Sequence, residues 1–238
     1  MEFTWGSVVS QAFGVYFKRF ATYFLIALVA SIPSLLASIA MRSVTVAAGE
    51  TGTLLVYRLI QTLAWLLSQG LAAGMVVSTV FGQLQGKTVS LGDALRTGVS
   101  FAMPVMLVVF VSALLITVGF ALLLIPGLIF LSMLYVATPA LIAEKLSVGG
   151  AFSRSAELTK GLRNHVVSVP FALGLLALII FWALARAVDE TTPGHFLLSE
   201  LISTVFVGLN GVAAAVSYHR LRRIRDGLDE DSLAAVFD

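Results

Sequence analysis

Six long apolar segments dominate this chain, and each approaches the length needed to cross a bilayer. They cover residues 21–41, 54–81, 103–125, 127–143, 166–187 and 196–218. A spanning helix needs about 20 apolar residues, because the hydrocarbon core is about 30 Å thick. Charged residues make up only 12% of the chain, whereas a soluble domain has about 25%. The sequence therefore predicts an all-α integral membrane protein with six transmembrane helices.

Two local features refine this topology. Ile125-Pro126-Gly127 separates the third and fourth segments, which predicts a very tight turn there and a hairpin with almost no loop. Lys18 and Arg19 precede the first segment, as basic residues precede the apolar region of a signal peptide. The apolar run of this segment is longer than the roughly 7–15 residues of such a region, so an uncleaved anchor is favoured.

The basic residues are unevenly distributed along the chain. Twelve of the fifteen Lys and Arg lie before the first segment, in the 82–102 and 144–165 loops, or after the last segment. With six helices, all four of these regions lie on one side of the membrane. The positive-inside rule then predicts that both termini are cytoplasmic.

Two loops begin with a similar amphipathic sequence pattern. "VSLGDALRTG" covers residues 89–98 and "LSVGGAFSRSAELTKG" covers residues 146–161. In each, a Ser suited to capping a helix N-terminus, Ser90 or Ser147, precedes small residues and a helical pattern. Apolar and charged positions fall on opposite faces, which predicts interfacial helices over 90–102 and 148–162 on the cytoplasmic surface. Residues 7–20 are a weaker third copy.

If all three copies are genuine, the chain consists of three parallel repeats, each an interfacial helix followed by a transmembrane hairpin. The alternative is that basic, amphipathic loops are common in multi-pass proteins, and short pattern matches are often accidental. Residues 1–227 form the predicted membrane domain. Residues 228–238 form an acidic cytoplasmic tail.

The basic side chains of these loops are predicted to contact anionic lipid headgroups, because each Lys or Arg near such a surface gains about 1 kcal/mol. The predicted headgroup contacts are Arg96, Arg154, Lys160, Arg163, Arg220, Arg222, Arg223 and Arg225. The lipid bilayer is thus the expected partner. A second copy of the chain or another membrane protein is an open alternative, and nucleic acid is not expected.

Polar residues follow a stripe along two of the predicted spans. Arg58, Gln61 and Gln69 lie in the second, and Glu200 and Asn210 lie in the sixth. Because charge in hydrocarbon costs roughly 2.5–3.5 kcal/mol on insertion scales, such residues usually face the bundle interior or an aqueous cavity. The stripe therefore predicts either a polar pathway or, as the favoured interpretation, snorkelling and hydrogen bonds between helices.

Small residues and prolines indicate how the helices pack. Gly70 and Gly74 form a Gly-x-x-x-Gly face that permits close helix packing, within the chain by default. Four prolines lie inside or at the start of spans and predict kinks there. They are Pro33, Pro104, Pro139 and Pro170.

The sequence shows no catalytic, metal-binding or phosphate-binding motif. There is no cysteine, the three histidines are scattered, and no nucleophile–base pair or phosphate loop has supporting context. The sequence predicts no catalytic residues, no metal site and no cofactor.

One longer pattern resembles a known family. It consists of Pro126-Gly127, the Glu144 turn, the run Ala151…Arg154-Ser155…Leu158…Lys160-Gly161, and Tyr218…Leu221-Arg222…Gly227. These features, over about residues 89–227, resemble the membrane domain of bacterial glycerophosphoryl diester phosphodiesterases and its stand-alone relatives. The resemblance implies a multi-pass module of the bacterial inner membrane. Phosphodiesterase activity does not follow, because in that family it belongs to a separate soluble barrel.

Two functional hypotheses result. The first is a non-enzymatic module that organises or scaffolds lipid and protein neighbours. The alternative is a transporter or permeation pathway lined by the polar stripes of the second and sixth spans.

Overall fold

The computed structural model describes residues 3–45, 51–189 and 192–227. The acidic segment 228–238 lies outside the described residues. The described part is built from helices, in the order α1 (Trp5–Lys18), α2 (Phe20–Thr45), α3 (Thr51–Leu84), α4 (Leu91–Leu122), α5 (Leu124–Leu134), α6 (Ala137–Glu144), α7 (Val148–Thr159), α8 (Arg163–Ala187) and α9 (Pro193–Asp226).

Six helical stretches in this part of the chain are long and apolar enough to cross a membrane. They are Phe20–Ala40, Leu55–Leu84, Leu91–Leu122, Leu124–Glu144, Arg163–Ala187 and Gly194–Asp226. Each coincides with one predicted segment, so the prediction of six candidate spans is confirmed. They support a multi-pass membrane protein.

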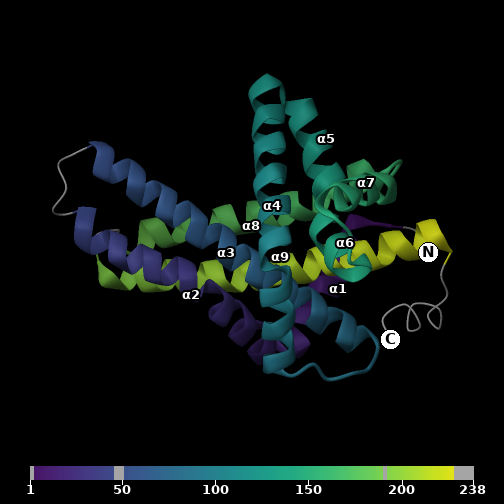
Figure 1. The fold of residues 1–238 in the computed structure, drawn as a ribbon, viewed down its shortest axis with the longest axis horizontal. Helices are drawn as coiled ribbons and strands as arrows, with labels where there is room; N and C mark the ends of the chain where they lie inside the picture. Colours follow the sequence, from purple (N-terminus) through teal and green to yellow (C-terminus); the bar gives the residue numbers. More distant parts are fainter. Residues whose placement is uncertain (1–2, 46–50, 190–191, 228–238) are drawn as a thin grey trace.

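The six spans are arranged in two groups (Figure 1). α2, α3, α8 and α9 run side by side, and the hairpin of α4 and α5 crosses this layer steeply. α3 contacts both groups. In the most apolar stretch of α3, 56% of the residues are buried inside the protein, whereas the corresponding share is 17% in α4 and in α8. α3 is therefore the central helix.

Glycines permit the close contact between α3 and α4. A Cβ added to Gly74 would lie 2.6 Å from the Cα of Gly98, and one added to Gly70 would lie 2.7 Å from the carbonyl oxygen of Ala102. Both distances are shorter than a carbon can approach, so only glycine fits here. The expected packing role of Gly70 and Gly74 is found, within one chain.

The α4–α5 hairpin differs from the prediction in its turn. The chain reverses at Leu123, whose extended backbone separates the two helices, and not at Pro126-Gly127. Pro126 lies in the first turn of α5, where its missing N–H breaks no helical hydrogen bond. Gly127 instead lets the helices approach, since its Cα would be 2.9 Å from a Cβ on Gly119.

The fourth span consists of two helices. α5 ends at Leu134 and α6 begins at Ala137. Pro139 explains the break, because its ring clashes with the carbonyl four residues earlier, at Tyr135. The other three prolines lie inside α2, α4 and α8 without interrupting them.

The predicted interfacial helices have different outcomes. Both serine caps are confirmed: Ser90 accepts a hydrogen bond from the Asp93 N–H (3.1 Å), and Ser147 accepts one from the Gly150 N–H (3.2 Å). α1 and α7 are separate short helices. Residues 91–102, however, are the first turns of α4, so a separate helix over 90–102 is wrong. Gly98 lies in this stretch and Pro104 just after it, but neither ends the helix, which continues from Leu91 to Leu122.

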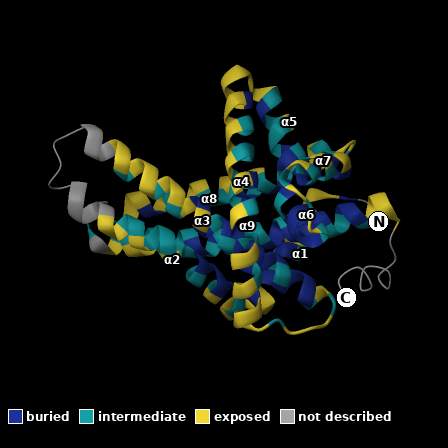
Figure 2. Cartoon of the chain, in the orientation of Figure 1, coloured by how far each residue is buried: buried dark blue, intermediate teal, exposed yellow. Residues whose placement is uncertain are grey.

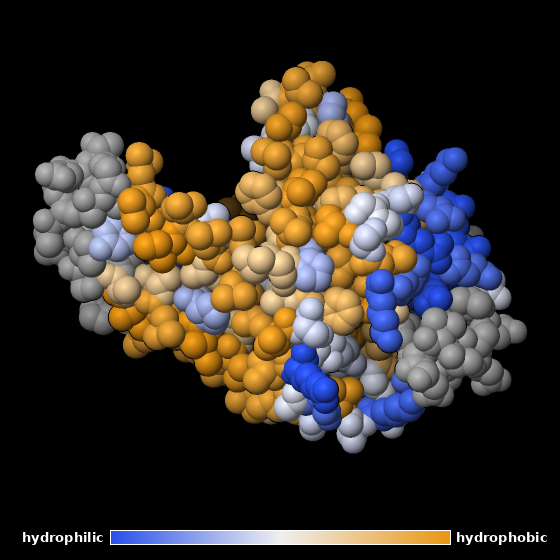
Figure 3. All heavy atoms as spheres, in the orientation of Figure 1, coloured by the Kyte–Doolittle hydropathy of each residue, from blue (hydrophilic) through white to orange (hydrophobic). Residues whose placement is uncertain are grey.

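Burial and polarity are distributed unevenly over the molecule (Figures 2 and 3). Buried residues gather where α1, α6 and the second half of α9 meet α3, while Leu36 and Ile39 of α2, Leu55 and Leu59 of α3 and the outer part of the α4–α5 hairpin are exposed. Hydrophilic residues gather around α7 and the end of α9, and around the α3–α4 turn. We call α1, α6, α7 and residues 210–226 of α9 the basic end.

Candidate functional site

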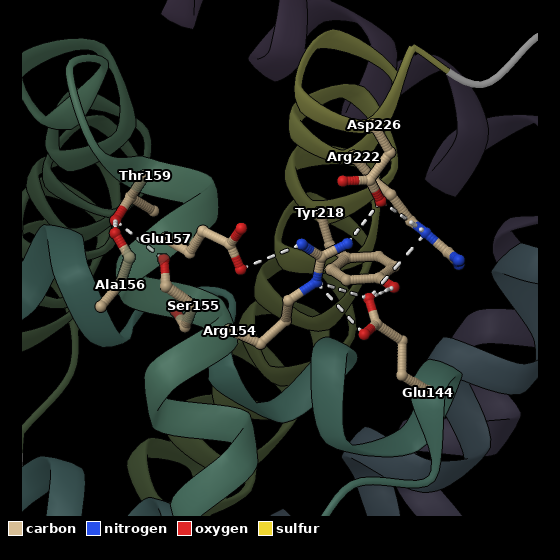
Figure 4. A network of polar contacts seen from close by, with 9 residues as sticks. All are labelled: Glu144, Arg154, Ser155, Ala156, Glu157, Thr159, Tyr218, Arg222 and Asp226. Carbon is tan, nitrogen blue, oxygen red and sulfur yellow. Dashed lines mark hydrogen bonds and ion pairs between the residues drawn. The ribbon is translucent and has the colours of Figure 1, made fainter.

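Arg154 occupies the centre of a polar network at the basic end (Figure 4). Its Nε donates to both carboxylate oxygens of Glu144, at 3.0 and 3.2 Å. One Nη donates to Glu157 at 3.2 Å, and the other donates to Asp226. All three guanidinium nitrogens are therefore engaged by carboxylates, from three different helices.

Arg222 and Tyr218 complete the network from α9. The Tyr218 hydroxyl donates to Glu144 Oε1 at 2.7 Å. Arg222 Nε lies 3.3 Å from Asp226 and 3.9 Å from Glu144, and the Arg222 side chain is only 10% exposed. Two guanidinium groups thus face three carboxylates in a region of limited solvent access, where charge pairing is stronger than at an open surface.

The electrostatics of Arg154 follow from this setting. Its side chain is 17% exposed. Burial by itself would lower the pKa of Arg154, but the hydrogen bonds that it donates to Asp226 and Glu144 outweigh burial and raise the pKa of the guanidinium above its ordinary value. Arg154 is therefore a permanent cation, and the network has no proton to exchange through it.

A second contact fixes α7 beneath the network. The Ser155 hydroxyl donates to the Met133 carbonyl oxygen at 2.6 Å. That carbonyl lies in the last turn of α5, where the break before Pro139 leaves acceptors without helical partners. Ala151, Ser155 and Leu158 are fully buried by protein. The apolar face predicted for α7 is real, but it packs on protein where lipid contact was expected.

The eight predicted headgroup residues now divide into two groups. Arg154 and Arg222 are held by the network, and Arg220 donates to Gln11 at 2.6 Å and to Ser7, which joins α9 to α1. These three arginines donate hydrogen bonds within the protein, so the structure gives them partners other than headgroups, and their headgroup contact stays a prediction. The others lie at least partly at the surface: Arg96, Lys160 and Arg225 are exposed, and Arg163 and Arg223 are half-buried.

Two of the exposed cations lie at the same turn although they are far apart in sequence. Lys160 is the C-cap residue of α7, and Gly161 follows it with a positive φ of 79°. An added Cβ at Gly161 would lie 3.7 Å from Nη2 of Arg225. Lys160 and Arg225 therefore border the same turn, which positions cationic groups from α7 and α9 together.

The network itself is suited to holding helices together rather than to catalysis. Its carboxylates accept hydrogen bonds from guanidinium groups and a phenol, so none of them has the free lone pairs that a general base uses. Sequence reasoning missed Glu144 and Asp226 as partners of Arg154, and Tyr218 as a donor to Glu144. The i,i+4 spacing of Arg222 and Asp226 was the available signal. Several residues that carry the family resemblance, including Glu144, Arg154 and Tyr218, meet in this network.

A second polar region lies between α2, α3 and α9. It is a hollow of about 40 Å³, lined in part by Trp65 and Gln69 of α3 and by Glu200, Ser203 and Thr204 of α9. The structure thus brings together parts of the two predicted stripes. A space of this size holds on the order of one to three water molecules.

Sequence reasoning missed the α2 side of this hollow. Ser31 and Ser34 line it, and the Ser34 N–H donates to Ser68 Oγ at 3.1 Å. The two serines flank Pro33, so the available signal was a hydroxyl on each side of a residue that tends to kink a helix.

The other stripe residues lie elsewhere. Gln61 donates to Ser38 Oγ at 3.1 Å. Arg58 is exposed, and Asn210 donates to the Phe206 carbonyl of its own helix at 2.9 Å. Neither Arg58 nor Asn210 is among the described residues that line the hollow. The hollow therefore includes only Gln69 and Glu200 of the predicted stripe residues.

Packed side chains close the hollow towards the basic end. A Cβ on Gly208 would lie 2.8 Å from the Tyr16 ring, and one on Gly211 would lie 3.0 Å from Val76. Tyr16, Val76 and Val212 are fully buried. The hollow is therefore a pocket in one half of the bundle and does not lead into a polar path along α9.

Over the residues that the structure describes, no group of three His, Cys, Asp or Glu side chains is placed to hold a metal ion. Comparisons with protein-family models, curated proteins and solved structures found no match to this chain.

Proposed function

We propose that this chain is a non-enzymatic module of a bacterial inner membrane whose basic end faces the cytoplasm and binds anionic lipid headgroups. The observation that carries the proposal is that Lys160 directly precedes the Gly161 turn and that Nη2 of Arg225 lies 3.7 Å from where a Cβ on Gly161 would be. Both side chains are exposed. The nearby carboxylate of Asp226 is engaged by Arg154 and Arg222, so it does not neutralise them fully.

The ion-pair network supports this role by making the basic end rigid. It ties α7 to α6 and α9, so the two cations are held in place before a headgroup arrives. Preorganisation of this kind lowers the entropy cost of binding. Arg154, Arg220 and Arg222 hold the helices of the basic end together, and the exposed cations bind the phosphate of the headgroup.

The alternative of a permeation pathway is less well supported. The hollow at Glu200 is small, and the bundle beyond it is filled by Tyr16, Val76 and Val212. Transport through it would require a large rearrangement of α3 and α9.

The test replaces Lys160 and Arg225 together by Gln, which keeps their stems and removes their charges. The matched control is Arg58→Gln, an exposed cation far from the basic end. Purified full-length protein is examined by native mass spectrometry with phosphatidylglycerol and, in parallel, phosphatidylcholine. Because each cation is worth about 1 kcal/mol at an anionic surface, the double variant should retain phosphatidylglycerol on the order of 30-fold more weakly.

The control should retain phosphatidylglycerol as the wild type does. The preference should also weaken at high salt, since exposed charges are screened. An unchanged phosphatidylglycerol preference in the double variant would overturn the proposal.

A further inference from the structure

The hollow between α2, α3 and α9 contains a carboxylate without a cationic neighbour. Glu200 is the only charged side chain among the described residues that line it. It lies seven residues into α9, roughly 10 Å from the helix start. In a membrane, an ionised carboxylate at this depth needs a compensating positive charge or strong hydrogen bonds.

The hydroxyl groups around Glu200 present oxygen lone pairs to the hollow. Ser31 donates its proton to the Ala27 carbonyl at 2.7 Å, and Ser34 donates to the Ser31 carbonyl at 2.9 Å. Thr204 donates to the Glu200 carbonyl at 2.8 Å. A hydroxyl has one proton, so each of these three oxygens is left with acceptor capacity only.

Ser68 adds a neutral group to this set. Its oxygen already accepts a hydrogen bond from the Ser34 N–H. Gln69 and Trp65 supply neutral donors at the rim, which can orient the Glu200 carboxylate but carry no charge. The hollow therefore combines one negative charge with several hydroxyl oxygens, which is the ligand chemistry that hard cations prefer.

The size and charge of the hollow select among hard cations. A divalent ion is usually held by several carboxylates or by carboxylates and many waters, and this hollow offers one carboxylate in about 40 Å³. A single negative charge matches a small monovalent ion, which would fill the space together with on the order of one water.

We infer that the hollow is a binding site for a small alkali cation, with Glu200 as the charged ligand and Ser31, Ser34 and Thr204 as neutral oxygen ligands. Binding there would neutralise Glu200 and join α2 to α9. The inference does not depend on lipid binding at the basic end, because the two sites share no residue.

The experiment measures equilibrium binding of ²²Na⁺ to purified full-length protein in non-ionic detergent, with choline as the background cation. Wild-type protein should bind saturably and unfold at a higher temperature in NaCl than in choline chloride. Glu200→Gln should lower the affinity at least roughly tenfold, equivalent to about 1.4 kcal/mol. Glu157→Gln is the matched control, because it removes an exposed carboxylate at the basic end and should bind like wild type.

Two further variants keep the charge and remove one oxygen each. Ser34→Ala and Thr204→Val should each weaken ²²Na⁺ binding severalfold. They also decide the matter if Glu200→Gln does not fold: unchanged affinity in both would overturn the inference.

Infrared spectroscopy separates a bound cation from a bound proton. Difference spectra between NaCl and choline chloride should show carboxylate bands that shift with Na⁺ and disappear in Glu200→Gln. A protonated-carboxyl band that is lost in Glu200→Gln and insensitive to Na⁺ would mean that Glu200 is neutral, and the inference would fail. Absence of saturable ²²Na⁺ binding to the wild type would also overturn it.

Discussion

The basic end and the half of the bundle around Glu200 accommodate carboxylates in opposite ways. At the basic end, Glu144 and Asp226 are surrounded by guanidinium groups and a phenol that converge from α7 and α9. Around Glu200, the neighbours are neutral hydroxyl, amide and indole groups. The comparison teaches that carboxylates are paired with cations between helices at one end, whereas at the other end the lining of the hollow pairs Glu200 with neutral groups only.

The same contrast appears in the packing. Near the basic end, close glycine contacts and fully buried side chains such as Tyr16, Tyr23 and Met75 make a protein-like interior. Towards the hairpin turn, Leu122, Leu123 and Ile125 are about 70% exposed. Apolar surface of this kind suits a lipid environment and gives these helices little tertiary support in the protein itself.

The largest expected effect tests the packing side of the comparison. Gly74→Val should destabilise the protein by about 1–3 kcal/mol or prevent folding, because a Cβ there overlaps the Gly98 backbone. Gly174→Ala is the control, since nothing lies within 4 Å of a Cβ on α8 at that position. Thermal unfolding in detergent measures both. Equal unfolding temperatures for the two variants would show that α3 and α4 are not in close contact.

The second-largest expected effect tests how much the ion pairs of the basic end stabilise the protein. Glu144→Gln should lower the free energy of unfolding by about 1.5–3 kcal/mol, because hydrogen bonds to a charged group are lost and Arg154 is left under-paired. Glu157→Gln removes a carboxylate that contacts the same arginine but is 67% exposed. It should change stability by less than about 0.5 kcal/mol.

Denaturation of both variants in the same detergent makes this measurement. A similar loss in the free energy of unfolding for Glu144→Gln and Glu157→Gln would show that the network stabilises the fold no more than a solvated surface contact does.

The smallest effect concerns Tyr16, which packs α1 on α9. Burial raises the pKa of Tyr16 to about 12, from an ordinary value of about 10. The native state therefore holds its phenolic proton more tightly than the unfolded state. This contribution is intact below pH 10 and is lost as the pH rises from 10 to 12.

Tyr16→Phe should consequently lose less stability than the wild type between pH 10 and 12. At pH 7 the substitution should be close to neutral, since the Tyr16 hydroxyl is buried without a hydrogen-bond partner among the described residues and the ring stacking on Tyr23 at 5.7 Å remains. Unfolding temperatures of both proteins across this pH range provide the test. Identical alkaline profiles would place the Tyr16 hydroxyl in water.

Local sequence rules predicted much of the fold. Spans were found because their length and composition are set by the bilayer and do not depend on neighbours. The caps at Ser90 and Ser147 were found because a cap involves residues three apart. The turn at Leu123 was missed because Pro126-Gly127 fits a turn and the start of a helix equally well, and only the contact with Gly119 distinguishes them.

The candidate sites were less predictable. Gln69 and Glu200 were singled out because polar residues are rare in apolar helices, yet Ser31 and Ser34 were not, since serine is common in such helices. The carboxylate partners of Arg154 were not predicted. Its charge is visible in the sequence, but its partner on α9, Asp226, is 72 residues away.

By itself, the sequence determined the helical membrane class, the six candidate spans and the crowding of basic residues between particular spans, because hydropathy, helix length and charge are properties of short segments. Only the tertiary structure decided that Arg154 binds carboxylates, that Arg225 lies at the turn after Lys160, and that the described residues around the hollow at Glu200 include no cation. These outcomes depend on how α7 and α9 rotate and cross, and that is set by close contacts between residues far apart in the chain.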